Sequence, residues 1–232
     1  MLAGLLVGAL ILLVVTSLLW HALSSRPSSD LGSVVSPPGR PDCRPAGGAL
    51  PRPGPCGDTW RRAEAPNAAG AVVAPPSASV GAIWRALWAT GSPLANNTPR
   101  RDGRTYAEYV WDKGRQTGVD PAVVMGFFRM ESHYGIEGIA VHTHSLSNAR
   151  PIGAQRALCT NDGCYADEST WWAGINDIYA LLRAYADRGL TTADTAIPVW
   201  APSSDHNNIR AYRAAVGQTL RTLNAASRAT AP

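Results

Sequence analysis

Residues 118–135 read GVDPAVVMGFFRMESHYG, and this stretch decides how the rest of the 232-residue chain is interpreted. Asp120 followed by Pro121 is typical of a helix start, with the aspartate as N-cap and the proline at the first helical position. The residues that follow are mostly apolar, and glycine, here Gly135, commonly ends a helix. The pattern predicts a buried helix whose apolar stripe contains Val123, Val124, Phe127, Phe128 and Met130.

Glu131 lies on this apolar stripe, four residues after Phe127, in the last turn of the predicted helix. Apolar surroundings and the negative end of the helix dipole both disfavour a charged carboxylate, so they raise its pKa. A general acid that works near neutral pH needs such a raised pKa. Glu131 is therefore a candidate catalytic acid. The alternative is a helix-end glutamate that points to solvent or pairs with Arg129 or Arg150.

Helical periodicity recurs on both sides of this stretch. It predicts helices at residues 80–89, 105–117, 169–188 and 208–223, and a small, polar, glycine-rich loop at residues 138–155. Asn161-Asp162-Gly163 between two short runs predicts a β-hairpin at residues 157–166. Asp167 and Glu168 are expected at the start of the helix that follows, and Asp205 as the cap of the last helix. The sequence thus predicts a mainly α-helical fold, of the α+β kind, with one small hairpin.

Composition divides the chain into four parts. Residues 1–25 contain no Lys, Arg, Asp or Glu. About twenty apolar residues match the ~30 Å hydrocarbon core of a bilayer, so we expect a retained transmembrane anchor, with a cleaved signal peptide as the alternative. Residues 26–76 hold eleven of the eighteen prolines and predict a disordered, Pro-rich linker. Residues 77–226 are the predicted folded domain, and residues 227–232 a tail.

The four cysteines form two local pairs, Cys43 with Cys56 and Cys159 with Cys164. Such pairs are typical of disulfides in an oxidising compartment, although reduced thiols are the alternative. The arginines after the apolar run would favour a cytoplasmic location for the folded domain. The cysteines favour the opposite orientation. We therefore expect a single-pass protein of the cell membrane whose folded domain is extracytoplasmic.

Charge and histidine spacing argue against two other classes of function. The net charge is +4, from 21 basic and 17 acidic residues, and no single run concentrates it, so nucleic acid is not an expected partner. His133, His142 and His144 could supply zinc ligands, but no H-E-x-x-H helix accompanies them. We therefore expect neither a metal nor a cofactor.

Four motifs, in order, resemble the glucosaminidase family of peptidoglycan hydrolases. The first is the Gly-Val-Asp-Pro entry with its helix ending Glu131-Ser132-x-Tyr134-Gly135. The second is Asn148-Ala149-Arg150, and the third is YADES at residues 165–169 before a long helix. The fourth is Trp200-Ala201-Pro202-Ser203-Ser204-Asp205, followed by Asn207, Asn208 and Tyr212. Their order and spacing match over residues 103–223.

The resemblance implies a lysozyme-like fold with helical lobes around a cleft. It also implies hydrolysis of the β-1,4 bond after N-acetylglucosamine in the glycan strand of peptidoglycan. Glu131 would be the general acid that protonates the glycosidic oxygen, with Asn148 in the loop flooring the cleft and Trp200 holding sugar or water. Tyr134, Arg150 and Asp205, which belong to the matched motifs, are the other expected substrate-binding residues.

The chain departs from the family in the hairpin. Some relatives place a second glutamate there as base, whereas residues 138–166 of this chain contain no Glu and a single Asp, Asp162. Asp162 is therefore the candidate second carboxyl. An inverting reaction needs two carboxyls ~6.5–9.5 Å apart and a retaining one ~5–5.5 Å. Substrate assistance by the 2-acetamido group, a single-acid lytic transglycosylase reaction and an inactive glycan-binding module of the same fold are the alternatives.

Overall fold

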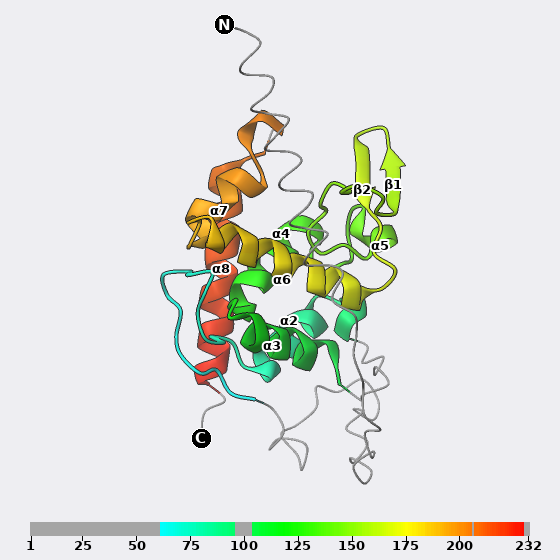
Figure 1. Cartoon of the computed structure of the whole chain (residues 1–232). Helices are drawn as coiled ribbons and strands as arrows, with labels where there is room; N and C mark the ends of the chain where they lie inside the picture. Colours follow the sequence, from blue (N-terminus) through cyan, green and yellow to red (C-terminus); the bar gives the residue numbers. More distant parts are fainter. Residues whose placement is uncertain (1–60, 96–103, 206, 230–232) are drawn as a thin grey trace, which may run out of the picture. The chain divides into compact units, whose positions relative to one another are not determined.

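The computed structural model describes residues 61–95, 104–205 and 207–229. Within these ranges the chain is mainly helical with one antiparallel hairpin, which confirms the predicted fold class at that level (Figure 1). The elements are α2 (Val80–Ala89), η3 (Pro93–Ala95), α3 (Tyr106–Thr117), α4 (Pro121–Ser132), α5 (Ala140–Thr143), β1 (Ala157–Thr160), β2 (Gly163–Ala166), α6 (Trp171–Asp187), α7 (Ala193–Trp200), η4 (Ser203–Asp205) and α8 (Ile209–Arg228).

The N-terminal predictions lie outside the described residues. These are the transmembrane anchor at residues 1–25, most of the linker and the Cys43–Cys56 pair. In the part of the chain that the structure describes, no helix is both long enough and apolar enough to cross a membrane.

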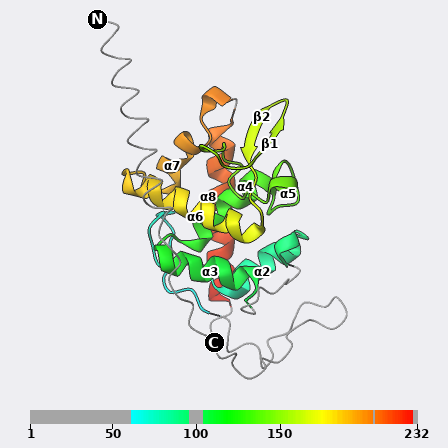
Figure 2. The ribbon, with the colours of Figure 1, turned by 45° about the vertical axis from the view of Figure 1, so that its right-hand side comes forward.

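Helix α4 lies at the centre of the helical body and packs against α3, α5, α6 and α8 (Figures 1 and 2). It begins as predicted, with Asp120 as N-cap and Pro121 in the first turn. Four of the five residues of the predicted stripe are fully buried, but Met130 is 40% exposed, so the stripe ends before it. A Cβ on Gly126 would lie 2.9 Å from Val216 Cγ1. Because glycine carries no side chain, α4 and α8 can pack this closely.

The other predicted helices are also present, and their starts follow from local capping. Ser79 caps α2 and Thr170 caps α6, while Thr105 forms a capping box with Glu108 at the start of α3. In each case a side-chain oxygen accepts from a backbone N–H that the first helical turn leaves unpaired. Among the described α-helices, two were not predicted, α5 within the expected loop and α7, which begins at the Thr192 capping box.

Three details of the predicted boundaries were wrong. The N-cap of α8 is Asn208, whose Oδ1 accepts from Ala211 N at 3.0 Å, rather than Asp205. The helix also continues to Arg228, so the predicted tail begins inside it. At the end of α4 the cap is His133 in a left-handed conformation, and Gly135 follows two residues later.

Asp167 and Glu168 do not cap α6. Asp167 instead forms an ion pair with Arg156 at 2.9 Å, and Glu168 accepts from Gln155 Nε2 at 2.9 Å. Thr170 takes the capping position, because its hydroxyl oxygen accepts from Ala173 N. The two acidic side chains therefore tie the segment before β1 to the segment after β2.

Residues 61–76 pack onto the helical body, which differs from the predicted boundary at residue 77. Val72 is fully buried in the core, and isolated bridges join Ala71 to Thr192 and Val73 to Val119. Asn67 is buried as well, and its Nδ2 donates to Asp120 Oδ2 at 2.7 Å. Proline content led to the prediction of a linker here, but non-local pairing overrides that local signal.

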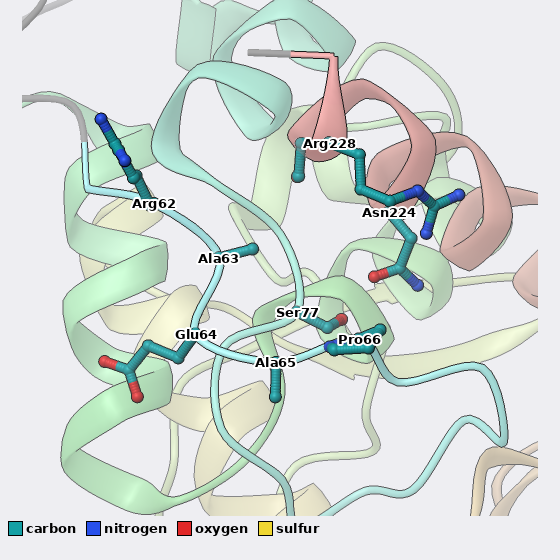
Figure 3. Close-up of a pocket in the computed structure, with 9 residues that line it drawn as sticks. Arg62, Ala63, Glu64, Ala65, Pro66, Ser77, Asn224 and Arg228 are labelled. Atoms are coloured by element: carbon teal, nitrogen blue, oxygen red, sulfur yellow. The ribbon is translucent and has the colours of Figure 1, made fainter. Parts of the chain in front are cut away.

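A pocket of about 210 Å³ lies where this segment meets the end of α8 (Figure 3). Its walls include Glu64, Pro66, Ser77 and Arg228, together with Asn224. None of the residues that surround Glu131 lines this pocket.

The hairpin is confirmed in position and register. Strands β1 and β2 are antiparallel, with Cys159 opposite Cys164, and these two cysteines form a disulfide. The predicted turn was Asn161-Asp162-Gly163, and in the structure Asn161 and Asp162 form it while Gly163 begins β2 opposite Thr160. In both views the hairpin projects from the helical body beside α5 (Figures 1 and 2).

Candidate functional site

Glu131 accepts hydrogen bonds from three side chains that come from different parts of the chain. Trp200 Nε1 and Tyr212 Oη each donate to Glu131 Oε1 at 2.6 Å. Asn148 Nδ2 donates to Oε2 at 3.1 Å and to the Glu131 carbonyl oxygen at 2.8 Å. The end of α4, the loop after α5, the end of α7 and the start of α8 therefore meet at one carboxyl group.

Neither alternative interpretation of Glu131 fits this geometry. Arg129 Nη1 donates to Thr219 Oγ1 at 3.2 Å, on α8. The Arg150 guanidinium instead contacts the hairpin. Among the described residues, Glu131 therefore has no arginine partner, and its carboxyl group faces the side chains of Trp200 and Tyr212.

A left-handed turn positions Glu131 at the helix end. His133, Tyr134 and Gly135 have φ angles of 48°, 62° and 85°. Residues other than glycine rarely adopt this region, and successive residues that do so mark a site where packing enforces the conformation. A larger residue than glycine does not fit at position 135, because a Cβ there would lie 2.7 Å from the Trp171 ring.

Tyr134 is buried rather than available to a ligand. It is 4% exposed, its ring packs edge-on against Phe128, and its carbonyl oxygen accepts from Ser92 Oγ at 2.7 Å. Burial also raises the pKa of its hydroxyl. The predicted substrate-binding role of Tyr134 is therefore replaced by a structural one, which is to hold the turn after α4.

Trp200 and Tyr212 are both supported by Phe127. The Phe127 ring lies 4.7 Å from the Trp200 ring and 5.7 Å from the Tyr212 ring, both in edge-on geometry. Phe127 is one helical turn before Glu131, so the same face of α4 carries the carboxyl group and the ring that orients its donors. Trp200 was among the predicted site residues. Tyr212 stood in the matched motif without an assigned role, although a polar aromatic residue on the buried face of α8 was a usable signal.

The electrostatics of Glu131 follow from burial and hydrogen bonding. Burial raises its pKa, whereas the hydrogen bonds from Tyr212, Trp200 and Asn148 lower it, and burial has the larger effect. Within the described residues, no second carboxylate contributes to this balance. The pKa of Tyr212 is raised well above its usual value by burial and by Glu131, so its hydroxyl keeps the proton that it donates.

The two carboxyl oxygens of Glu131 are not equivalent. Oε1 accepts two hydrogen bonds at 2.6 Å, which occupy its lone pairs. Oε2 accepts only the longer bond from Asn148. A proton added to this carboxyl group therefore belongs on Oε2, which is the oxygen able to deliver it.

The remaining predicted residues lie apart from this cluster. Asp162 is exposed in the hairpin turn, and Arg150 donates to the carbonyl oxygens of Asp162 and Cys164 while stacking 4.6 Å from the Tyr165 ring. These contacts of Arg150 thus stabilise the hairpin. Asp205 lies in η4, and its side chain is outside what the structure describes.

The histidines that raised the question of zinc have other neighbours. His133 Nδ1 lies 3.6 Å from Glu137 Oε1, and His144 Nδ1 lies 3.2 Å from the Glu168 carbonyl oxygen. Among the described residues, no three His, Cys, Asp or Glu side chains are grouped so as to hold a metal ion.

Comparison with protein-family models, with curated proteins and with solved structures gave no match to this chain.

Proposed function

We propose that this protein is a glycosidase that cleaves the β-1,4 bond after N-acetylglucosamine in peptidoglycan, with Glu131 as the general acid. The observation that carries the proposal is a partly buried glutamate at a helix end, whose Oε1 accepts from Trp200 and Tyr212 and whose Oε2 accepts only from Asn148 among the described residues and so has a lone pair left for a proton. A raised carboxyl pKa suits proton donation near neutral pH. The order of motifs along the chain supports a lysozyme-like arrangement.

A single-carboxyl reaction fits this site better than a reaction with two. No carboxylate in the described ranges acts on Glu131, and Asp162 is exposed in the hairpin turn. In the proposed reaction the Oε2 proton passes to the glycosidic oxygen as the C1–O bond breaks. The acetamido carbonyl oxygen of the same sugar then bonds to C1, giving an oxazolinium ion. Water opens this ring by adding to C1 and returns one proton to Glu131.

The proposed location is the outer side of a membrane, where peptidoglycan lies. The Cys159–Cys164 disulfide supports an oxidising compartment, and the apolar run at residues 1–25 supports attachment by a single helix. The partners are then a glycan strand and the membrane itself.

The test compares the full chain with its Glu131→Gln variant on purified peptidoglycan, with mass spectrometry of the released fragments. Glu137→Gln is the matched control, because Glu137 is exposed and follows the same helix. We expect reducing N-acetylglucosamine ends from the wild type and from Glu137→Gln, and a loss of about 10²–10⁴-fold in Glu131→Gln.

Two other outcomes would redirect the proposal. Anhydro-muramyl ends would indicate a lytic transglycosylase that uses the same acid. Binding of all three proteins to the wall without any release would contradict the enzyme and leave a glycan-binding module.

A further inference from the structure

Asp177 on α6 is a partly buried carboxylate that the proposed reaction does not use. Its Oδ2 accepts from Ser147 Oγ at 3.0 Å. Burial raises the pKa of Asp177, and the hydrogen bond from Ser147 opposes that effect. Burying a carboxylate costs free energy, which hydrogen bonds to it offset in part. Ser147, which supplies such a hydrogen bond, adjoins the candidate site.

Ser147 directly precedes Asn148, the residue whose amide reaches Glu131. The Ser147 side chain is buried, and its Oγ lies 3.2 Å from Ser145 Oγ and accepts from Ala149 N at 3.3 Å. The hydroxyl of the residue before Asn148 thus accepts from the backbone N–H of the residue after it, and it also contacts the Ser145 side chain. Asn148 itself has a φ of 47°, a conformation that a non-glycine residue adopts only when its surroundings enforce it.

Helix α6 reaches this loop directly. A Cβ on Gly174 would lie 2.0 Å from the His144 carbonyl oxygen, so the α6 backbone touches the loop where it begins. The end of β2 and the residues after it also bind this loop. Ala166 N donates to the Ala149 carbonyl oxygen and Glu168 N to the Thr143 carbonyl oxygen, both at 2.8 Å. Asp177 supplies the contact at the centre of this clamped loop.

We propose that Asp177 is a positioning residue: through Ser147 it fixes the left-handed turn at Asn148 and so aims the Asn148 amide at Glu131. The effect of Asp177 on catalysis rests on the proposed function, but its effect on Asn148, and through Asn148 on Glu131, does not need a substrate. Because the Asn148 hydrogen bond lowers the pKa of Glu131, a loosened Asn148 leaves that pKa higher.

The experiment is a carboxyl ¹³C NMR titration of the full chain, labelled at its five glutamates. We expect Asp177→Ala and Ser147→Ala each to raise the pKa of Glu131 by about half a unit or more. Since both act through one hydrogen bond, the double variant should shift it no further than the larger single change. Asp177→Asn retains an acceptor oxygen for Ser147 and should restore most of the wild-type value.

Asp112→Ala is the control for general destabilisation, since Asp112 is buried and pairs with Arg104 at 3.2 Å. It should lower the melting temperature and leave the Glu131 pKa unchanged. An unchanged Glu131 pKa in folded Asp177→Ala, or additive shifts in the double variant, would overturn the inference. If Asp177→Ala does not fold, an unchanged pKa in Ser147→Ala overturns it equally.

Hydrolysis assays separate this inference from the proposed function. If the variants shift the pKa of Glu131 but the wild type hydrolyses no peptidoglycan, the proposed function is rejected and the positioning role of Asp177 is retained. Glu131-dependent hydrolysis without the shifts would reject the positioning role alone. Where both hold, Asp177→Ala should lower kcat with little change in KM, because Asn148 acts on the acid, and Asp177→Asn should recover it.

Discussion

Each end of α4 carries a carboxyl group, fully buried at the start and partly buried at the end, and the two sites are built differently. At the start, Asp120 is fully buried, and its oxygens accept from Ser77 N, Ala122 N, Ser77 Oγ and Asn67 Nδ2 at 2.6–3.0 Å. At the end, Glu131 accepts from the side chains of Trp200, Tyr212 and Asn148. Backbone amides take part at the first site but not at the second.

The helix dipole acts in opposite directions on the two carboxyl groups. The N-terminus attracts negative charge, so it stabilises the Asp120 carboxylate, whereas the C-terminus repels the charge of Glu131. Backbone N–H groups are fixed donors that join Asp120 into the fold. The donors to Glu131 are side chains on separate elements, and burial raises its pKa. One carboxyl group therefore holds the helix in place, and the other is the one to which the proposed function gives proton transfer.

Removing residues before Ser77 should produce the largest effect. A chain of residues 77–232 lacks Asn67, a partner of Asp120, and the fully buried Val72. Losing a buried apolar side chain and a hydrogen bond to a charged group costs about 3–6 kcal/mol in total, a large share of the stability of a small domain. We expect residues 77–232 to show no cooperative unfolding transition by circular dichroism, whereas residues 52–232 should show one. Equal melting temperatures would contradict the packing of this segment.

A matched pair of amide substitutions tests the comparison at both ends. Asp120→Asn turns a nitrogen toward the donors of Ser77 or Asn67 and should destabilise the fold by about 3 kcal/mol. Glu131→Gln keeps an oxygen for Trp200 and Tyr212 and loses the 3.1 Å bond from Asn148, whose Nδ2 still donates to the carbonyl oxygen of residue 131, so its stability should change by less than about 1 kcal/mol. Urea unfolding at neutral pH measures both. Equal losses would mean that Glu131 is as structural as Asp120.

The start of α4 could be predicted from the sequence, and its surroundings could not. The Asp120-Pro121 pair is a local capping signal, and the residues named for it behave as expected. The donors of Asp120 at Asn67 and Ser77 are 53 and 43 residues away along the chain, in or beside a segment whose proline content indicates a linker. Local propensity contains no information about such pairing.

At the other end of α4, the position of Glu131 on an apolar stripe predicted a carboxyl group with a raised pKa, and its partial burial raises that pKa as expected, while its role as a catalytic acid stays a prediction. Its partners at Asn148 and Trp200 came from motif resemblance, not from periodicity. Tyr134 was assigned to the site because it belongs to the same motif, yet its ring is 4% exposed. Asp177 gave no signal, because its role depends on a contact with Ser147, 30 residues earlier in the chain.

Tyr212→Phe should have a smaller effect, confined to the acid. It removes the hydroxyl that donates to Oε1 at 2.6 Å and keeps the ring that packs against Phe127. Because this hydrogen bond lowers the pKa of Glu131, its loss raises that pKa, and the protonated acid persists to higher pH. We expect kcat to fall roughly tenfold or more and the alkaline limb of the pH–rate profile to shift to higher pH. Tyr109→Phe, which removes the hydroxyl bonded to Asn176, is the control and should leave that limb in place.

The smallest expected effect is the pH dependence of stability that Glu131 contributes. Its pKa in the folded state lies above the usual 4.5, so between these two values the folded chain binds more protons than the unfolded chain. Stability therefore falls as pH rises through this window, and the contribution is fully present only below about 4.5. Glu131→Gln has no such titration, and Asp177 and Glu168, whose pKa values burial also raises, titrate in both proteins. The unfolding free energy of the wild type minus that of Glu131→Gln, measured in urea at a series of pH values, should thus decrease with pH and then level off. A difference that stays constant or increases would mean that the hydrogen bonds from Trp200, Tyr212 and Asn148 match or outweigh the effect of burial on the pKa of Glu131.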